Sequence, residues 1–289
     1  MSTHSIPASS KVWFVTGASS GFGRAVVEEA LRRGDRVVAT ARRPEALADL
    51  AARAPEERLH LAELDVTRPE QVRAAVAAAV SRFGRIDVLV NNAGFSILGA
   101  VEETGDDALR ATMELMFFAA AATTREVLPH MRARASGTIV QMTSVAGIST
   151  APGFGAYCAA KHALEALSEC LAQEVKPLGI RVLVVEPGTF RTALFGPAFR
   201  TMPAMDAYAA TVGQMRSWVT QMDGEQAGDP AKAARAIAEV VARPADELPL
   251  RLPLGGDAVD QIRGKLAFIA ADVDRTEAIA RATAFDAKP

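Results

Sequence analysis

Residues 12–23 read Val-Trp-Phe-Val-Thr-Gly-Ala-Ser-Ser-Gly-Phe-Gly, and this stretch decides the fold. Its apolar, β-branched start predicts a buried strand, and a helical stretch begins at Arg24. Between them, glycines with the spacing G-x-x-x-G-x-G permit a tight turn and a close approach of the backbone to a ligand. The following helix N-terminus supplies free N–H groups for phosphates. A dinucleotide is therefore expected on Gly17, Ser19, Ser20, Gly21, Phe22 and Gly23, the alternative being a plain glycine-rich turn.

Similar strands recur along the chain and alternate with helical stretches rich in Ala, Arg and Glu. Strands are expected at 12–16, 36–40, 59–64, 86–90, 138–142, 181–185 and 248–254, and helices at 24–33, 44–53, 69–83, 106–134, 156–177 and 230–242. The first six strands are nearly continuous apolar runs, so both of their faces should be covered, as in a parallel sheet. We therefore expect an α/β fold with a doubly wound, Rossmann-like parallel sheet of about seven strands.

The domain organisation is expected to be simple, because no linker rich in Gly, Ser or Pro divides residues 11–255. Residues 1–10 are expected to be a disordered lead-in. Residues 189–229 carry Pro, Met and aromatic side chains after the sixth strand, where a substrate lid would hang over the carboxyl edge of the sheet. Residues 256–289 are expected to form a helical tail that packs on the body or on a partner.

The composition argues against several classes of protein. A net charge of −2 and 6% aromatic residues give no sign of nucleic-acid binding. No apolar run reaches the ~18–20 residues of a membrane span, and the N-terminus lacks the apolar core of a signal peptide. Two cysteines in one expected helix and four scattered histidines fit neither a disulfide nor a metal site. A cytoplasmic protein without a metal is expected.

Tyr157 and Lys161 lie four residues apart in an expected helix, and Ser144 precedes the tyrosine by thirteen residues. The i, i+4 spacing places phenol and ammonium on one helix face, where the charge would lower the phenol pKa from its usual ~10. A serine hydroxyl can hold a carbonyl or alcohol oxygen beside them. The trio suits proton transfer at an alcohol oxygen coupled to hydride transfer at carbon. Taken alone, the pair also fits an ordinary amphipathic helix.

Cofactor preference depends on the end of the second strand. An acidic residue there would bond the adenosine ribose 2′-OH of NAD, but Ala41 is followed by Arg42 and Arg43. Two guanidiniums suit a 2′-phosphate, so NADP(H) is favoured over NAD(H); the alternative is a solvated arginine pair. Further cofactor contacts are expected after the third, fourth and sixth strands, at Asp65, Val66, Asn91, Ala93, Gly94, Pro187, Gly188, Thr189, Phe190 and Thr192.

The order and spacing of these motifs resemble those of the short-chain dehydrogenase/reductase superfamily over residues 11–255. The matching parts are residues 16–23, 65, 91–94, 144, 157, 161 and 187–188. The resemblance implies that Tyr157 is the general acid/base, that Lys161 lowers its pKa and holds the nicotinamide ribose, and that Ser144 orients the substrate oxygen. It also implies a homodimer or homotetramer, and the chain is similar to members acting on steroids, retinoids and other hydrophobic alcohols or ketones.

The sequence departs from the family at one position. Members usually carry an asparagine on the fourth long helix, which holds a water between the lysine and solvent. Alignment places Met116 there, and Asn91 and Asn92 are the only asparagines in the chain. A thioether is at best a weak acceptor. Four explanations of this difference are open. Another group, such as Thr112, could hold the water, or the backbone could kink there unaided. Proton exchange could instead be slow, or Met116 could simply pack in the core of an impaired enzyme.

Two functions fit these motifs. One is an NADP(H)-dependent oxidoreductase that interconverts a hydrophobic ketone or aldehyde and an alcohol. The alternative, motivated by Met116, is a catalytically weak NADP(H)-binding sensor or partner-binding protein. An epimerase or dehydratase is disfavoured, because these usually need a larger C-terminal domain. The expected substrate pocket is mostly apolar and consists of Phe95, Ser144, Phe154, Leu194 and Phe195.

Overall fold

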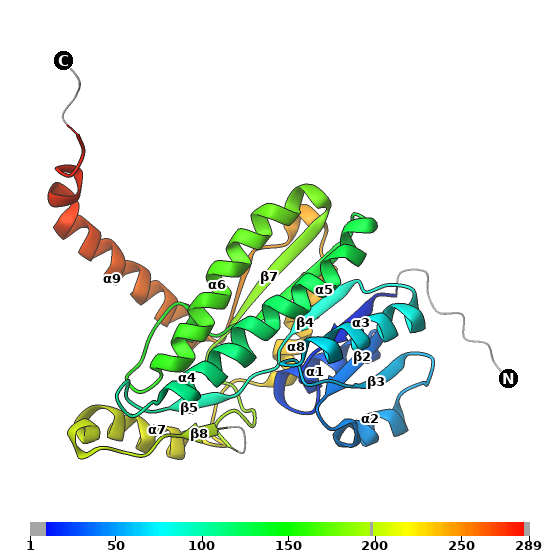
Figure 1. Ribbon diagram of the computed structural model, residues 1–289, viewed down its shortest axis with the longest axis horizontal. Helices are drawn as coiled ribbons and strands as arrows, with labels where there is room; N and C mark the ends of the chain where they lie inside the picture. Colours follow the sequence, from blue (N-terminus) through cyan, green and yellow to red (C-terminus); the bar gives the residue numbers. More distant parts are fainter. Residues whose placement is uncertain (1–9, 197–198, 286–289) are drawn as a thin grey trace.

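The computed structural model describes residues 10–196 and 199–285, in which strands and helices alternate (Figure 1). The strands are β1 (Val12–Val15), β2 (Arg36–Ala41), β3 (Leu59–Glu63), β4 (Val88–Asn91), β5 (Ser96–Leu98), β6 (Gly137–Met142), β7 (Ile180–Pro187), β8 (Phe199–Thr201) and β9 (Arg251–Leu254). The helices are α1 (Gly21–Arg32), α2 (Ala48–Arg53), α3 (Pro69–Phe83), α4 (Asp106–Met113), α5 (Ala119–Ala133), α6 (Gly155–Val175), α7 (Gln214–Met222), α8 (Pro230–Ala242) and α9 (Gly256–Arg281).

The main sheet confirms the predicted fold class. Seven parallel strands follow the order β3-β2-β1-β4-β6-β7-β9. The chain builds outward from β1 on one side and then crosses to β4 on the other, so the strand order reverses between β1 and β4. Such a reversal opens a crevice at the carboxyl ends of the strands, where ligands bind in folds of this type. The glycine-rich turn and residues 92–94 both leave the sheet at this crevice.

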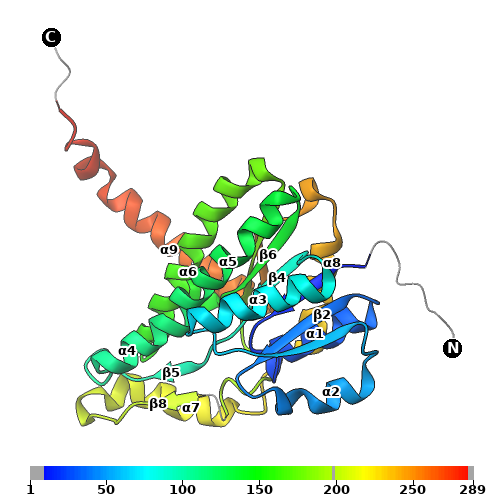
Figure 2. The same cartoon turned by 45° about the vertical axis from the view of Figure 1, so that its right-hand side comes forward.

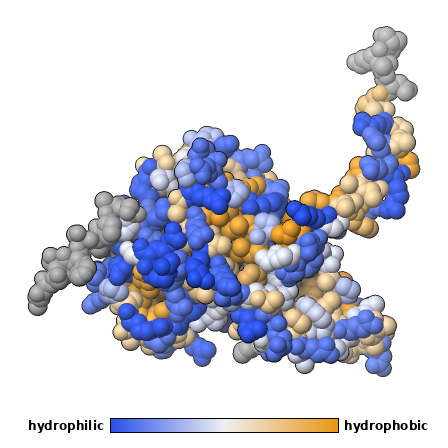
Figure 3. All heavy atoms as spheres, turned by 180° about the vertical axis from the view of Figure 1, so that it is seen from behind, coloured by the Kyte–Doolittle hydropathy of each residue, from blue (hydrophilic) through white to orange (hydrophobic). Residues whose placement is uncertain are grey.

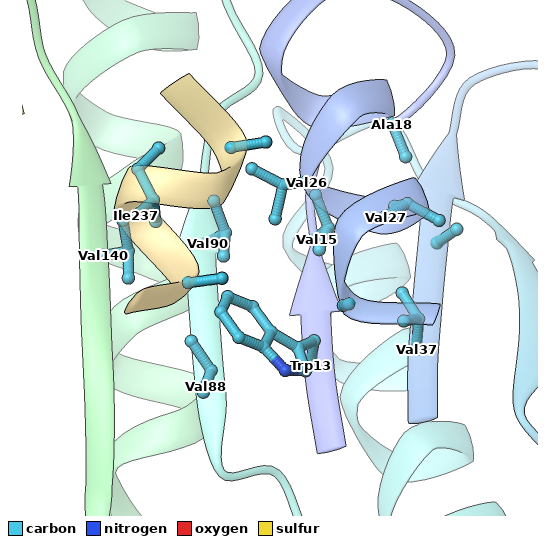
Figure 4. Packing of buried hydrophobic residues seen from close by; sticks show 14 of the residues in the cluster. Trp13, Val15, Ala18, Val26, Val27, Val37, Val88, Val90, Val140 and Ile237 are labelled. Atoms are coloured by element: carbon cyan, nitrogen blue, oxygen red, sulfur yellow. The ribbon is translucent and has the colours of Figure 1, made fainter. Parts of the chain in front are cut away.

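Helices cover both faces of the sheet (Figures 1 and 2). Helices α1, α2 and α8 pack on one face, and α3, α5 and α6 pack on the other. Successive strand residues point to opposite faces; Trp13 and Val15 therefore enter the first layer, and Phe14 enters the second. The indole N–H of Trp13 donates to Asp35 at 2.8 Å, and its ring packs among valines (Figure 4). Two buried faces explain why the strands are continuous apolar runs.

A second, two-stranded parallel sheet joins β5 to β8, with Ser96 opposite Phe199 and Leu98 opposite Thr201. Each strand has three residues, which is too short for a periodic sequence pattern. This sheet fixes the segment after β7 against the segment after β4. Helix α7 continues from there along the carboxyl edge of the main sheet (Figure 1).

The stretch 106–134, expected as one helix, contains a π-helical turn at Glu114–Phe118 between α4 and α5. Met116 lies in this turn and is buried. Turns of this kind insert one extra residue into a helix and are frequent at functional sites. The interruption therefore falls at the position where the sequence departs from the family it resembles.

Helix α9 leaves the sheet after β9 and extends away from the body (Figures 1 and 2). Ala258 in its first turn is buried, whereas most later residues are exposed. Among residues 10–196 and 199–285, no helix combines the length and apolar character needed to cross a membrane.

Candidate active site

A cleft of about 520 Å³ lies at the carboxyl edge of the sheet, where the strand order reverses. The predicted site residues that line it are Gly17, Ser19, Ser20, Gly21, Phe22, Arg42, Asp65, Val66, Ala93, Gly94, Phe95, Met116, Ser144, Tyr157, Lys161, Pro187, Gly188, Phe190, Thr192 and Leu194. Six other predicted residues lie outside its lining: Gly23, Arg43, Asn91, Phe154, Thr189 and Phe195. The cleft thus brings residues from loops and helices along most of the chain to one place.

The glycine-rich turn is packed too closely for side chains. A Cβ atom on Gly17, whose φ is +65°, would lie 2.9 Å from the Ala93 Cα atom. On Gly23 it would lie 2.4 Å from both the Gly17 carbonyl oxygen and the Asn92 side-chain nitrogen. That Asn92 amide donates to the carbonyls of Thr16 and Gly17, each at 3.0 Å. Gly23 and Asn92 therefore hold the backbone of the turn in its conformation, and α1 begins where the turn ends.

Beside the glycine-rich turn, at the ends of the neighbouring strands, Arg42 follows β2 and Asp65 follows β3. The Thr67 hydroxyl donates to Asp65 at 2.7 Å, and the Thr67 N–H donates at 3.0 Å. These bonds, with the nearby charge of Arg42, hold the pKa of Asp65 below its usual value. Asp65 is therefore ionised beside the guanidinium. Arg43 is exposed and lies outside the cleft lining.

All three residues of the predicted catalytic trio line the cleft. Ser144 starts a 3₁₀ turn after β6; its hydroxyl lies 3.4 Å from the Pro187 carbonyl and accepts the Ala146 N–H at 3.1 Å. Tyr157 and Lys161 are both buried in α6, and the lysine nitrogen lies 5.7 Å from the tyrosine ring centre. The ammonium donates to the Met142 carbonyl at 2.8 Å.

Burial dominates the titration of both α6 side chains in the protein alone. It raises the pKa of Tyr157 to about 12, although a hydrogen bond with Ser144 lowers it. Burial lowers the pKa of Lys161 to about 8, although the negative charge of Glu165 raises it. Desolvation of the phenolate is the largest influence on the Tyr157 pKa in this state, and the ammonium expected to lower that pKa bonds the Met142 carbonyl.

Met116 packs between the cleft and α6. Its sulfur would lie 3.6 Å from a Cβ atom on Gly94, and its side chain is buried. A void of about 10 Å³, near the size of one water, is lined by Met116, Lys161 and Asn91 among others. Thr112, considered above as a substitute for the missing asparagine, donates its hydroxyl to Ala108 at 2.7 Å in its own helix and is not part of the cleft lining.

Two predicted cofactor contacts have other partners in the structure. The buried Asn91 amide lies within 3.3 Å of the Ala120 carbonyl, and within 3.0 Å of Thr124 and Gln141, so it ties β4 to α5 and β6. Both the N–H and the hydroxyl of Thr189 donate to Asp257 at 2.7 Å. Asp257 lies in the first turn of α9, 68 residues away, and no sequence signal links the two.

A buried carboxylate cluster, also absent from the sequence prediction, lies behind the trio. Arg251 on β9 contacts Glu165 at 2.6 Å and also pairs with Glu186. Burial raises the pKa of both carboxyl groups. A Cβ atom on Gly147 would lie 2.8 Å from Glu165, so the cluster supports the turn that begins at Ser144. The sequence did hold one signal for Glu165: residues 157, 161 and 165 are four apart, so they share one face of the helix.

Aromatic side chains gather at the end of the cleft where the substrate is expected. Phe154 and Phe195 each pack edge-to-face on Phe199, with ring centres 6.4 and 5.8 Å apart, and Phe195 packs similarly on Trp218. These two predicted pocket residues thus form a layer behind the lining. Arg200, which the prediction missed, lines the cleft with its guanidinium 3.9 Å from the Phe95 ring centre.

Comparisons with known proteins show the family to which the chain belongs. A family model described as short chain dehydrogenase matches residues 11–225. Oxidoreductase BOA17 of Botryotinia fuckeliana is 40% identical over 250 residues, covering 86% of this chain and 90% of that protein. The crystal structure of a short-chain dehydrogenase from Streptomyces avermitilis is 50% identical, with a TM-score of 0.90, and covers 96% of this chain and 100% of that one. A short chain dehydrogenase from Burkholderia cenocepacia in complex with NADP is 26% identical, with a TM-score of 0.71, over 92% and 97% of the two chains.

Proposed function

Because the chain belongs to the short-chain dehydrogenase family, we propose that it is an NADP(H)-dependent oxidoreductase that interconverts hydrophobic ketones or aldehydes and alcohols. One observation carries the proposal: Ser144, Tyr157 and Lys161 line the same cleft as the glycine-rich turn. The bound NADP of the Burkholderia cenocepacia structure and the apolar substrate end of the cleft support the choice of cofactor and substrate class.

The cleft residues fit a dinucleotide. A Cβ atom at Gly17 or Gly23 would clash with neighbouring protein atoms, so only glycine fits at these positions. The backbone of this turn, next to the N-terminus of α1, would bind the pyrophosphate. Arg42 would bind the 2′-phosphate of the adenosine ribose. The nicotinamide supplies or accepts the hydride when bound. Lys161 would hold its ribose, as the family resemblance implies.

Protein side chains handle the proton. In the reductive direction the carbonyl carbon gains a hydride, and Tyr157 gives its phenolic proton to the oxygen, which the Ser144 hydroxyl holds in place. Lys161 has a pKa of about 8 in the protein alone, so it exchanges a proton readily near neutral pH and can stabilise the phenolate left on Tyr157. A pKa raised to about 12 keeps Tyr157 protonated until the reaction draws the proton away.

The direct test follows NADPH absorbance with a panel of aliphatic, aromatic and polycyclic ketones and aldehydes. NADPH binding with turnover of at least one apolar carbonyl is expected. Binding without any turnover in either direction would favour the alternative, a cofactor-binding sensor or partner-binding protein, which Met116 motivates. A protein that binds no nicotinamide cofactor would contradict both.

Arg42→Ala is expected to weaken NADPH binding by about 10–100-fold, because it removes a charged hydrogen-bonding partner of the 2′-phosphate. The affinity for NADH, which lacks that phosphate, should fall by less than about threefold. Arg43→Ala is the matched control, since Arg43 is a neighbouring exposed arginine outside the cleft lining. Equal effects of Arg42→Ala on both cofactors, by fluorescence titration, would refute the phosphate assignment.

Met116→Asn is expected to raise kcat by about tenfold, since an amide beside the void at Lys161 can bond a water that returns protons to the lysine. The same change should lower the free energy of unfolding by about 1–3 kcal/mol, because it buries a polar group in place of a fitted thioether. Met116→Leu keeps the volume and serves as the control. An unchanged kcat in Met116→Asn would show that proton return does not limit this enzyme.

A further inference from the structure

The tail helix α9 carries an apolar seam with heptad spacing. Its members are Val259, Ile262, Leu266, Ile269 and Val273, and Thr276 and Ala280 continue the pattern. The intervals alternate between three and four residues over about three heptads. Such a repeat is typical of helices that pair as coiled coils, whereas a helix packed on a globular body usually shows a wider apolar face.

The α9 seam lies open in the single chain. Leu266 and Val273 are each 57% exposed, and Ile269 is 44% exposed. Figure 3 shows hydrophobic residues along α9 where it stands clear of the body. The first turn is fixed to the body through the buried Ala258 and the bonds of Asp257 to Thr189. A regular apolar stripe this far from its own core marks an interaction surface.

We propose that the α9 seam pairs with the α9 seam of a second copy of this chain in antiparallel orientation. An alignment centred between residues 267 and 268 places Leu266 opposite Ile269 of the partner subunit, and Ile262 opposite Val273 of the partner subunit. Val259 then faces Thr276 of the partner subunit. The contact is twofold symmetric and closes at two subunits, because each seam pairs with itself.

Charges beside the seam select the antiparallel orientation. Lys265 and Asp272 occupy the same flanking position in consecutive heptads. The antiparallel alignment brings Lys265 next to Asp272 of the partner subunit, twice in each pair. A parallel pair would instead bring Asp272 next to Glu277 of the partner subunit, two like charges. Flanking charges of this kind set partner choice and orientation in coiled coils.

The same charges argue against a lipid surface as the occupant. Beyond Asp257, which bonds Thr189, helix α9 carries four acidic and four basic residues. Helices that lie in a membrane interface usually present a polar face rich in lysine and arginine. A second copy of the chain therefore fits the α9 seam better than a membrane does.

The first test measures the mass of the full-length protein by light scattering after size exclusion. The wild type should have at least twice the 30.5 kDa mass of one chain. Leu266→Glu with Ile269→Glu should halve that mass, while NADPH binding stays within about twofold because the seam lies outside the cleft. Phe268→Glu is the matched control: Phe268 is 59% exposed on α9 but lies off the seam, and the mass should not change.

A charge exchange tests the orientation. Lys265→Asp alone and Asp272→Lys alone each place like charges together and should separate the subunits at least partly. Combining both changes in one chain should restore the wild-type mass. Mixing the two single variants should give a mixed pair, which native mass spectrometry resolves. A monomeric wild type, a mass unaffected by the double seam variant, or no recovery in the doubly exchanged chain would each overturn the proposal.

Discussion

Tyr157→Phe is expected to lower kcat by about 10²–10⁴-fold, the contribution typical of a positioned acid/base group. The change removes one oxygen and keeps the ring, so packing against Phe154, whose ring centre is 6.4 Å away, should persist. NADPH affinity should stay within about threefold, because the glycine-rich turn and Arg42 are untouched. Steady-state turnover and a fluorescence titration with NADPH measure the two quantities.

The chain offers a matched control for this variant. Tyr208 is the only other tyrosine, and its hydroxyl bonds Glu102 at 2.6 Å on the exposed outer side of the substrate end. Tyr208→Phe removes the same atom and should leave kcat within about twofold. If Tyr157→Phe kept wild-type turnover, the proton would have to come from another group and the proposed mechanism would fail.

Gly23→Ala is expected to weaken NADPH binding by about 100-fold or more and to lower the free energy of unfolding by about 1–3 kcal/mol. The new Cβ atom would lie 2.4 Å from the Gly17 carbonyl oxygen, so the turn must shift to accept it. That shift also disturbs the Asn92 amide, which bonds the Thr16 and Gly17 carbonyls. Backbone groups displaced by even a fraction of an ångström no longer match a pyrophosphate.

Gly264→Ala provides the comparison, because a Cβ atom there would meet open space on α9. This exchange should raise helix stability by about 0.5–1 kcal/mol and leave NADPH affinity unchanged. Thermal unfolding and NADPH titration of both variants separate a general glycine effect from the packing of the turn. Wild-type NADPH affinity in Gly23→Ala would show that the turn does not hold the pyrophosphate.

Local signals explain why much of the fold was predictable. Helices α3 and α8 match their expected ranges, because each begins with a proline in its first turn. The Asp229 carboxylate also caps α8 by accepting the Ala231 and Lys232 N–H groups. Gly84, with a φ of +77°, ends α3 in the left-handed conformation that favours glycine. The sheet was predictable because both faces of its strands are buried.

The unpredicted features depend on contacts between distant residues. The pairing of β5 with β8 joins segments that lie far apart in the sequence, and Asp257 reaches Thr189 across 68 residues. The π-helical turn at Met116 has helical composition on both sides, so periodicity could not reveal it. The raised pKa of Tyr157 follows mainly from its burial, which cannot be derived from spacing.

The small β5–β8 sheet separates a variable part of the chain from the cleft residues on the body. It anchors one end of the segment that contains α7, and the bridge between Phe190 and Gly228 anchors the other. The segment is thus held at both ends, while Ser144 lies at the turn after β6 and Tyr157 lies in α6. Insertions, deletions and substitutions in α7 can therefore change the segment between these two anchors while Ser144 and Tyr157 keep their places in the cleft.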